Sequence, residues 1–140
     1  MKSYRDLEIY KTAYKLALEV HKMSLTLPKY EIYEQGSQVR RSSKSVKDTI
    51  VGGYGRRRYK DDFIRFLIYS QSSCDEAISQ LNMISDIHFP DKTLNELINE
   101  YDILGKKINK FIQYVEKSWL TRNKKQETSN EKPETLKTKK

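Results

Sequence analysis

Apolar residues recur along much of the chain at alternating intervals of four and three, a spacing that keeps one face of an α-helix turned toward a neighbour. Four segments show the pattern, at 9–27, 39–53, 63–88 and 94–115, and the last is expected to reach Trp119. Pro28 ends the first segment and Pro90 the third, because a proline disfavours helix at the residue before it. The pattern therefore predicts four helices.

The connections between these segments are short, at 28–34, 52–59 and 89–91. Short connections between long helices force consecutive helices to run antiparallel. We therefore predict an all-α fold, an antiparallel up-down-up-down four-helix bundle formed by residues 1–120. Residues 121–140 contain Leu136 as their only large apolar side chain, so they cannot bury enough surface to fold, and we predict a disordered basic C-terminal tail.

The composition supports this interpretation and narrows the setting of the protein. Five Gly, three Pro and 33% charged residues favour long regular elements joined by few turns. The single cysteine, Cys74, excludes an intramolecular disulfide and cannot by itself supply a zinc site. No apolar run approaches the length of a membrane span, and the N-terminus lacks the apolar stretch of a signal peptide. We expect a cytoplasmic protein with no membrane partner.

Positive charge is concentrated in one segment rather than spread over the chain. The formal net charge is +8, and residues 39–60 alone contain eight Lys/Arg and one acid, Asp48. By contrast, residues 61–120 contain six Lys/Arg and ten Asp/Glu. A concentrated basic segment favours a polyanionic partner, and nucleic acid is the partner that we predict.

The basic segment divides into a helical ridge and a turn. Arg40, Lys44 and Lys47 follow spacings of four and three, so they share one solvated face of the second helix. Further cations continue this surface around the turn, where the glycines of residues 52–55 permit a positive φ. The predicted nucleic-acid-binding residues are Arg40, Lys44, Lys47, Arg56, Arg57, Arg58 and Lys60.

Two tyrosines, Tyr54 and Tyr59, flank the arginines of the turn. Their rings offer faces on which unpaired bases can stack, which favours RNA loops or single strands over regular duplex. The alternative is a solubilising surface with both tyrosines packed at the end of the bundle.

Arg41 has a different predicted role. Antiparallel packing around the turn brings it near the third helix, about one turn from Glu76, so we predict a structural ion pair between the two. Gln38 can join this polar cluster, and a phosphate contact by Arg41 is the alternative.

The sequence offers no set of residues that assembles a catalytic or metal site. The glycines of residues 52–55 lack the preceding strand and the Lys-[Ser/Thr] of a phosphate-binding loop. His21 and His88 lack the Glu three residues earlier that di-iron bundles need, and no Arg precedes either at the spacing of helical-bundle nucleases. Cys74 lies on the apolar stripe and is interpreted as a small buried hydrophobe. We therefore predict a protein that is not an enzyme and holds no cofactor or metal.

Apolar residues exceed what the core of one bundle needs. The third helix is apolar almost all the way round at 63–69, and the fourth carries a second apolar line. This line consists of Ile98, Gly105, Ile112 and Trp119. We predict that the surplus face is buried against another subunit, the alternative being a wide core stripe with scattered exposed apolar residues.

Several short motifs follow one another in a recognisable order along residues 6–88. They are Leu7-x-Ile9-Tyr10-x-x-Ala13, Pro28-x-x-Glu31, Gln38-Val39-Arg40-Arg41-x-x-x-Ser45-Val46, Gly53-x-Gly55-Arg56, Phe63-x-x-Phe66-Leu67 and Ser73-x-x-Glu76. Their order and spacing resemble the four-helix bundle family encoded in intervening sequences of bacterial 23S ribosomal RNA genes. The chain departs from the family pattern in the second helix, where the usual Asn and Glu are Thr49 and Gly52, and at Ser70 and Ser72.

This resemblance implies a ring-like homopentamer with no established enzymatic activity. The accessory proteins of diversity-generating retroelements look similar in fold, and they bind nucleic acid and a reverse transcriptase through a basic surface. The leading hypothesis is therefore a homo-oligomeric bundle, pentameric by the resemblance, that presents residues 40–60 and the tail to nucleic acid, RNA in particular. The alternative is a protein–protein adaptor or an accessory subunit, for example of a reverse transcriptase, bound through the apolar faces of helices three and four.

Overall fold

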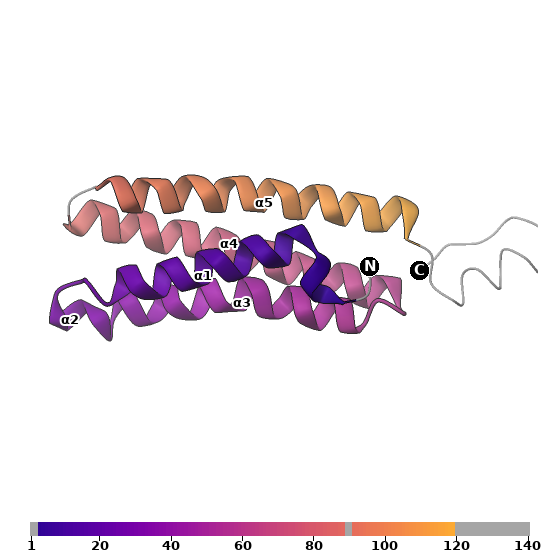
Figure 1. Cartoon of the computed structure of the whole chain (residues 1–140), viewed down its shortest axis with the longest axis horizontal. Coiled ribbons are helices and arrows are strands. Elements are labelled where there is room, and N and C mark those ends of the chain that lie inside the picture. The colour runs from indigo at the N-terminus through magenta and orange to yellow at the C-terminus, as the bar shows by residue number, and fades with distance from the viewer. Residues whose placement is uncertain (1–2, 89–90, 120–140) are drawn as a thin grey trace, which may run out of the picture.

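Helices make up all the regular structure in the part of the chain that the structure describes. The structure, a computed structural model, describes residues 3–88 and 91–119. In chain order the elements are η1 (Tyr4–Asp6), α1 (Glu8–Ser24), α2 (Lys29–Ile32), α3 (Gln35–Gly55), α4 (Lys60–His88) and α5 (Lys92–Ser118). Figure 1 shows α1, α3, α4 and α5 lying side by side as an elongated bundle, with α2 at one end. The predicted all-α bundle is confirmed.

The ends of the helices are fixed by local hydrogen bonds. Ser3 and Asp6 form a capping box on η1, and the Asp91 side chain caps α5 by accepting from the Leu94 N–H at 2.7 Å. The predicted tail at 121–140, and residues 89–90 of the last connection, lie outside the described residues. None of the helices among the described residues combines the length and the apolarity that crossing a membrane requires.

The core is built from the predicted apolar stripes. Each long helix turns one stripe inward, and the largest fully buried side chains include Leu16, Ile50, Phe63, Leu67, Leu81 and Tyr101. Burial departs from the prediction near the end of α5, where Ile112 is buried in the core. Ile112 belongs to the line predicted to face another subunit, so part of that line serves the core of this bundle.

Small polar side chains line the contact between α3 and α4. Hydrogen bonds across it join Ser42 to Gln80 (2.7 Å), Ser45 to Ser73 (2.8 Å), and Ser70 to the Val46 carbonyl (2.7 Å). Residue numbers rise along α3 from 42 to 46 while those of the partners on α4 fall from 80 to 70, so these helices are antiparallel. α4 and α5 are antiparallel as well, since Gln71 donates to the Gly105 carbonyl and Cys74 to the Tyr101 carbonyl.

The sequence predicted that the glycines at the end of α3 form a turn at 52–59 with a positive φ, but they belong to the helix. α3 continues to Gly55, and no glycine in it adopts a positive φ. A Cβ atom at Gly53 would lie 3.0 Å from Phe66 Cβ, and one at Gly52 would lie 3.1 Å from the Phe66 ring. These two glycines therefore let α4 approach α3 closely, and the chain turns only at residues 56–59.

A buried carboxylate holds the opposite end of the bundle. Glu31 on α2 is 4% exposed, and its Oε2 lies 2.6 Å from His88 Nε2 at the end of α4. Gln35 Nε2 donates to the same oxygen at 2.8 Å. The hydrogen bond with His88 is the main reason that the pKa of Glu31 lies below its usual value. His88 therefore joins α4 to α2.

Replacing Gly53 by Ala should lower stability, while the same change at Gly55 should not. The new methyl group at Gly53 would press on Phe66 and on the Phe63 carbonyl oxygen, 3.4 Å away, at a cost of about 1–3 kcal/mol. Among the described residues, no atom beyond the neighbouring backbone lies within 4 Å of that position at Gly55, where the higher helix propensity of Ala should add about 0.5 kcal/mol. Urea unfolding followed by circular dichroism measures both variants. Equal effects at the two positions would contradict the packing role of Gly53.

Candidate nucleic-acid interface

Arg40 is built into the packing of the bundle rather than into a solvated ridge. Its half-buried guanidinium donates from Nη1 to Ser24 Oγ at 2.7 Å and from Nη2 to the Ile32 carbonyl oxygen at 2.9 Å. It therefore ties the ends of α1 and α2 to α3. Gly36, one turn earlier, leaves space for it, since a Cβ there would lie 3.1 Å from Arg40 Nη1. The predicted solvated face does not hold at Arg40, because its Nη1 and Nη2 both donate within the protein.

The remaining residues of the predicted ridge, Lys44 and Lys47, are less exposed as a group than predicted. Lys44 is exposed on α3, whereas Lys47 is half-buried and its Nζ lies 2.6 Å from Asp48 Oδ1. Asp48 is the one acid of the basic segment, so this pair offsets the charge of Lys47 locally. Lys44 is the member of the ridge that stays fully at the surface.

Arg41 does not form the predicted ion pair with Glu76. Its Nη1 donates instead to Ser37 Oγ at 2.8 Å on the same helix, and both Arg41 and Glu76 are exposed. The neighbouring Ser42 takes the position facing α4, where it bonds Gln80. The polar contact between the helices is therefore made by uncharged side chains, and the charge of Arg41 adds to the exposed surface of α3.

The turn between α3 and α4 presents three consecutive exposed arginines, Arg56, Arg57 and Arg58. The Arg56 guanidinium lies 4.2 Å over the Phe66 ring, and the Arg57 guanidinium lies 4.0 Å over the Tyr54 ring. Each also donates one hydrogen bond of 2.9 Å to a carbonyl near the end of α3. A guanidinium carries further N–H groups, so both arginines keep donors for an external anion.

The two tyrosines of this turn differ in exposure. Tyr54 is buried, with 5% of its surface exposed, and its ring contacts Arg57 and Phe63. Tyr59, by contrast, is 54% exposed. Of the two predicted stacking residues, only Tyr59 is accessible to a base, whereas Tyr54 holds Arg57 in place.

The end of α5 joins this turn, a contact that the sequence-based prediction missed. Trp119 Nε1 donates to the Arg57 carbonyl at 3.2 Å, and the half-buried Lys60 donates from Nζ to the Glu116 carbonyl at 2.5 Å. Figure 1 shows the end of α5 beside the α3–α4 turn, at the far end of the bundle from α2. The indole N–H of Trp119 was the available signal, because a tryptophan packed into a protein usually finds a partner for it.

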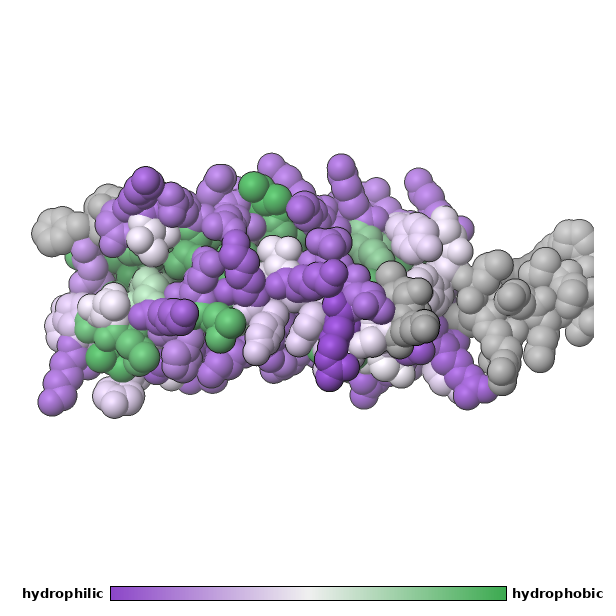
Figure 2. All heavy atoms as spheres, in the orientation of Figure 1, coloured by the Kyte–Doolittle hydropathy of each residue, from purple (hydrophilic) through white to green (hydrophobic). Residues whose placement is uncertain are grey.

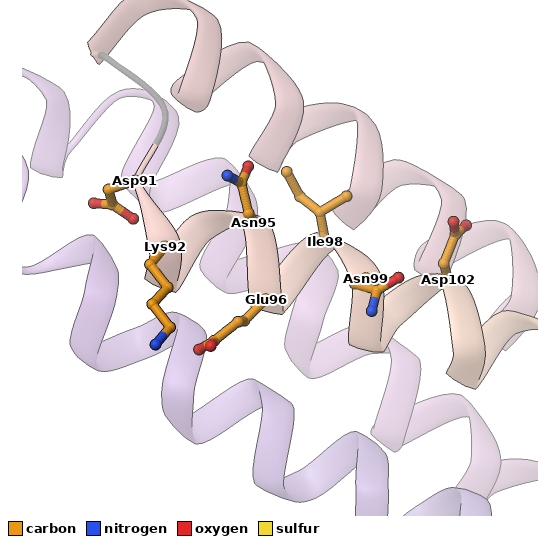
Figure 3. A pocket seen from close by; sticks show the side chains of 7 residues that line it. All are labelled: Asp91, Lys92, Asn95, Glu96, Ile98, Asn99 and Asp102. Carbon is orange, nitrogen blue, oxygen red and sulfur yellow. The ribbon is translucent and has the colours of Figure 1, made fainter.

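Two hollows of the described surface lie away from the turn and are not basic. One of about 720 Å³ at the start of α5 is lined by Asp91, Lys92, Asn95, Glu96, Ile98, Asn99 and Asp102. Figure 3 shows these side chains along successive turns of one helix, with carboxylates at several levels. A groove of about 680 Å³ between α4 and α5 is lined mainly by polar residues, and it includes Ile68 and Gly105 of the face predicted to contact another subunit. On the face seen in Figure 2, hydrophilic side chains predominate, and hydrophobic ones gather toward the end where α2 lies.

The side chains most suited to chemistry have structural roles. Cys74 is fully buried, its Sγ donates to the Tyr101 carbonyl at 3.2 Å, and burial is the main cause that raises the pKa of its thiol to about 12. This burial agrees with the prediction for Cys74. Within residues 3–88 and 91–119, no group of three or more His, Cys, Asp or Glu side chains comes together in a way that could hold a metal ion.

Replacing Arg40 by Gln should cost about 2 kcal/mol, because Ser24 and the Ile32 carbonyl lose their charged partner. The matched change Lys44→Gln removes an exposed positive charge from the same helix and should shift the free energy of unfolding by less than about 0.5 kcal/mol. Urea denaturation of the two variants gives the difference. Losses of similar size in both would mean that Arg40 has no special structural role.

The comparisons with known proteins agree with this architecture. The model of the 23S rRNA-intervening sequence protein family matches residues 5–110, from η1 into α5, and the matched stretch contains the α3–α4 turn with its arginines. Comparison with curated proteins gives no significant match. The family model covers most of the chain, and the motifs along residues 6–88 resemble the same family. The chain therefore belongs to the 23S rRNA-intervening sequence protein family.

Proposed function

We propose that this protein is a cytoplasmic, non-enzymatic homo-oligomer that binds nucleic acid, RNA in particular, through the basic turn between α3 and α4. The observation that carries the proposal is the stacking of Arg56 and Arg57 on aromatic rings, at 4.2 and 4.0 Å, beside the exposed Arg58. A stacked guanidinium is already oriented, so it loses less side-chain freedom when it binds a phosphate.

The distribution of charge supports a polyanion rather than a small anionic ligand. Three adjacent guanidinium groups project from one exposed turn, and none of the three lines either hollow described above. Guanidinium groups bind phosphates bidentately, and each neutralised phosphate releases counterions from a nucleic-acid backbone. The hollow at the start of α5 is acidic and would repel a nucleic-acid backbone. The end of the bundle that contains the α3–α4 turn therefore suits a polyanion better.

The family gives the reason to test RNA first. Its name associates these proteins with intervening sequences of 23S rRNA. RNA loops also place unpaired bases next to phosphates, a combination that the exposed Tyr59 and the neighbouring arginines can contact together.

The proposal includes assembly into a homopentamer, as the family resemblance implies, through the face formed by α4 and α5. Ile68 is 49% exposed beside the groove of about 680 Å³, which Ile78 also lines. The other residues that line the groove are mostly polar, so the support for burial against another subunit comes from these two isoleucines and from the family resemblance. A ring repeats the basic turn in every subunit, which strengthens binding to a long polyanion without any new contact.

A second candidate function is a protein–protein adaptor or an accessory subunit, for example of a reverse transcriptase. Tyr69, Met83 and Ile87 on α4 are 48%, 54% and 51% exposed, and exposed apolar side chains of this kind suit contact with a different protein as well as with a second copy. The mass in solution separates the two candidates, because an adaptor needs no self-association.

Binding of RNA should weaken steeply with salt, and the arginines of the turn should account for part of the slope. Each neutralised phosphate contributes about 0.7–0.9 to the fall of log K with log salt concentration. Replacing Arg56, Arg57 and Arg58 together by Gln should therefore reduce the slope by about 2. Fluorescence anisotropy of a labelled RNA at several salt concentrations measures it.

The control for this experiment is Lys29→Gln on α2, which removes an exposed positive charge at the other end of the bundle and should leave the slope nearly unchanged. Circular dichroism shows whether the triple variant is folded. An unchanged slope in a folded triple variant would remove the turn from the binding site.

Replacing Ile68 by Asp should dissociate the oligomer, because it places a charge in the apolar part of the α4–α5 groove. Light scattering should give the 16.6 kDa chain mass for this variant and about five times that mass for the wild type. The control is Tyr33→Asp, at an 80% exposed position near α2, which should keep the wild-type mass. A monomeric wild-type protein would contradict self-association and favour the adaptor.

A further inference from the structure

The last turns of α5 carry a basic stripe with one aromatic residue inside it. Lys107, Lys110, Tyr114 and Lys117 follow spacings of three and four, so they share one face of the helix, and all four are exposed. We call these four residues the α5 stripe. A count of charge by segment hides it, because residues 61–120 as a whole are acidic.

Tyr114 is held in place by other aromatic rings. Its ring centroid lies 5.9 Å from that of Phe111 and 6.3 Å from that of Trp119, and Trp119 lies 5.1 Å from the buried Phe63. These contacts orient Tyr114 while 50% of its surface remains exposed. A ring that is both oriented and accessible suits stacking of a planar ligand.

The α5 stripe adjoins the arginines of the turn. The hydrogen bond from Trp119 to the Arg57 carbonyl (3.2 Å) and that from Lys60 to the Glu116 carbonyl (2.5 Å) hold the two segments together. The acids at this end are Asp61, Asp62 and Glu116, and Asp62 pairs with Arg65 at 3.0 Å. The lysines of the stripe and the arginines of the turn outnumber these acids, so an accessible aromatic ring lies among mostly positive side chains at one end of the bundle.

We propose that this end of the bundle binds single-stranded nucleic acid, with an unpaired base stacked on Tyr114 and phosphates bound by Lys117 and Arg58. In a duplex the base faces are covered by neighbouring pairs, whereas a single strand can turn a base onto an aromatic side chain while its backbone follows the basic residues. The inference rests on the proposed nucleic-acid binding and adds a stacking residue and a phosphate-binding lysine on α5. Tyr114 and Lys117 lie beyond the stretch matched by the family model, so the inference does not follow from family membership.

Trp119 gives a direct readout, because it is the only tryptophan of the chain and its ring contacts Tyr114. The probes are a single-stranded oligouridylate of about 12 nucleotides, which lies within the usual site sizes, and inorganic polyphosphate of the same charge, which has no bases. The oligouridylate should quench the fluorescence of Trp119 and bind more tightly than polyphosphate. Tyr114→Leu should weaken binding of the oligouridylate about 10-fold and leave polyphosphate binding unchanged.

Two further variants serve as controls. Tyr114→Phe keeps the ring and should bind the oligouridylate nearly as well as the wild type, which separates stacking from loss of the hydroxyl. Tyr33→Leu removes an 80% exposed tyrosine near α2 and should have no effect on either probe.

The outcomes also distinguish this inference from the proposed function. Equal affinities for the two probes, together with no effect of Tyr114→Leu, would overturn stacking while nucleic-acid binding through the basic turn stands. Equal weakening of both probes by Tyr114→Leu would overturn it as well, because a stacking residue acts only on a ligand with bases. Binding of neither probe would overturn both proposals.

Discussion

The close approach of α3 and α4 is the constraint on which the rest of the structure depends. Gly52 and Gly53 have no side chain where Phe66 crosses α3, and the Ser70 hydroxyl reaches the Val46 carbonyl one turn further along. Small residues permit the short distance, and the hydrogen bonds between the helices then fix which levels of the two helices face each other. This register decides where the chain turns, and so which residues cap the end of the bundle.

The helices and most of the core could be predicted from the sequence, because burial repeats with the period of the helix and proline marks two of the ends. The roles of individual polar residues could not. Arg40 is one of several cations on α3, and nothing local distinguishes it, since its partners Ser24 and Ile32 belong to other elements. Tyr54 was equally ambiguous, because a tyrosine beside arginines either stacks on a ligand or supports the arginines themselves, and here it is buried.

A count of charged residues gives the amount of positive charge, but it does not show which cations are free to contact a ligand. The cations of α3 are partly used within the protein, by hydrogen bonds at Arg40 and by the pair with Asp48 at Lys47. Arg56 and Arg57 in the turn rest on aromatic faces, a contact that leaves much of a guanidinium edge open. A local count also overlooks cations on a helix whose other faces are acidic, as α5 illustrates. Which charges can meet a ligand is therefore a property of the packing and not of the composition.

The environment of Cys74 has a consequence for how the core can be observed. Its thiol is fully buried between α4 and α5, and with a pKa of about 12 almost none of it is thiolate near neutral pH. A thiol reagent can therefore modify the folded protein only at moments when these two helices separate. Because Cys74 is the only cysteine of the chain, the rate of labelling reports the frequency of that opening with no engineered probe. The native sequence thus contains its own reporter of local opening between α4 and α5.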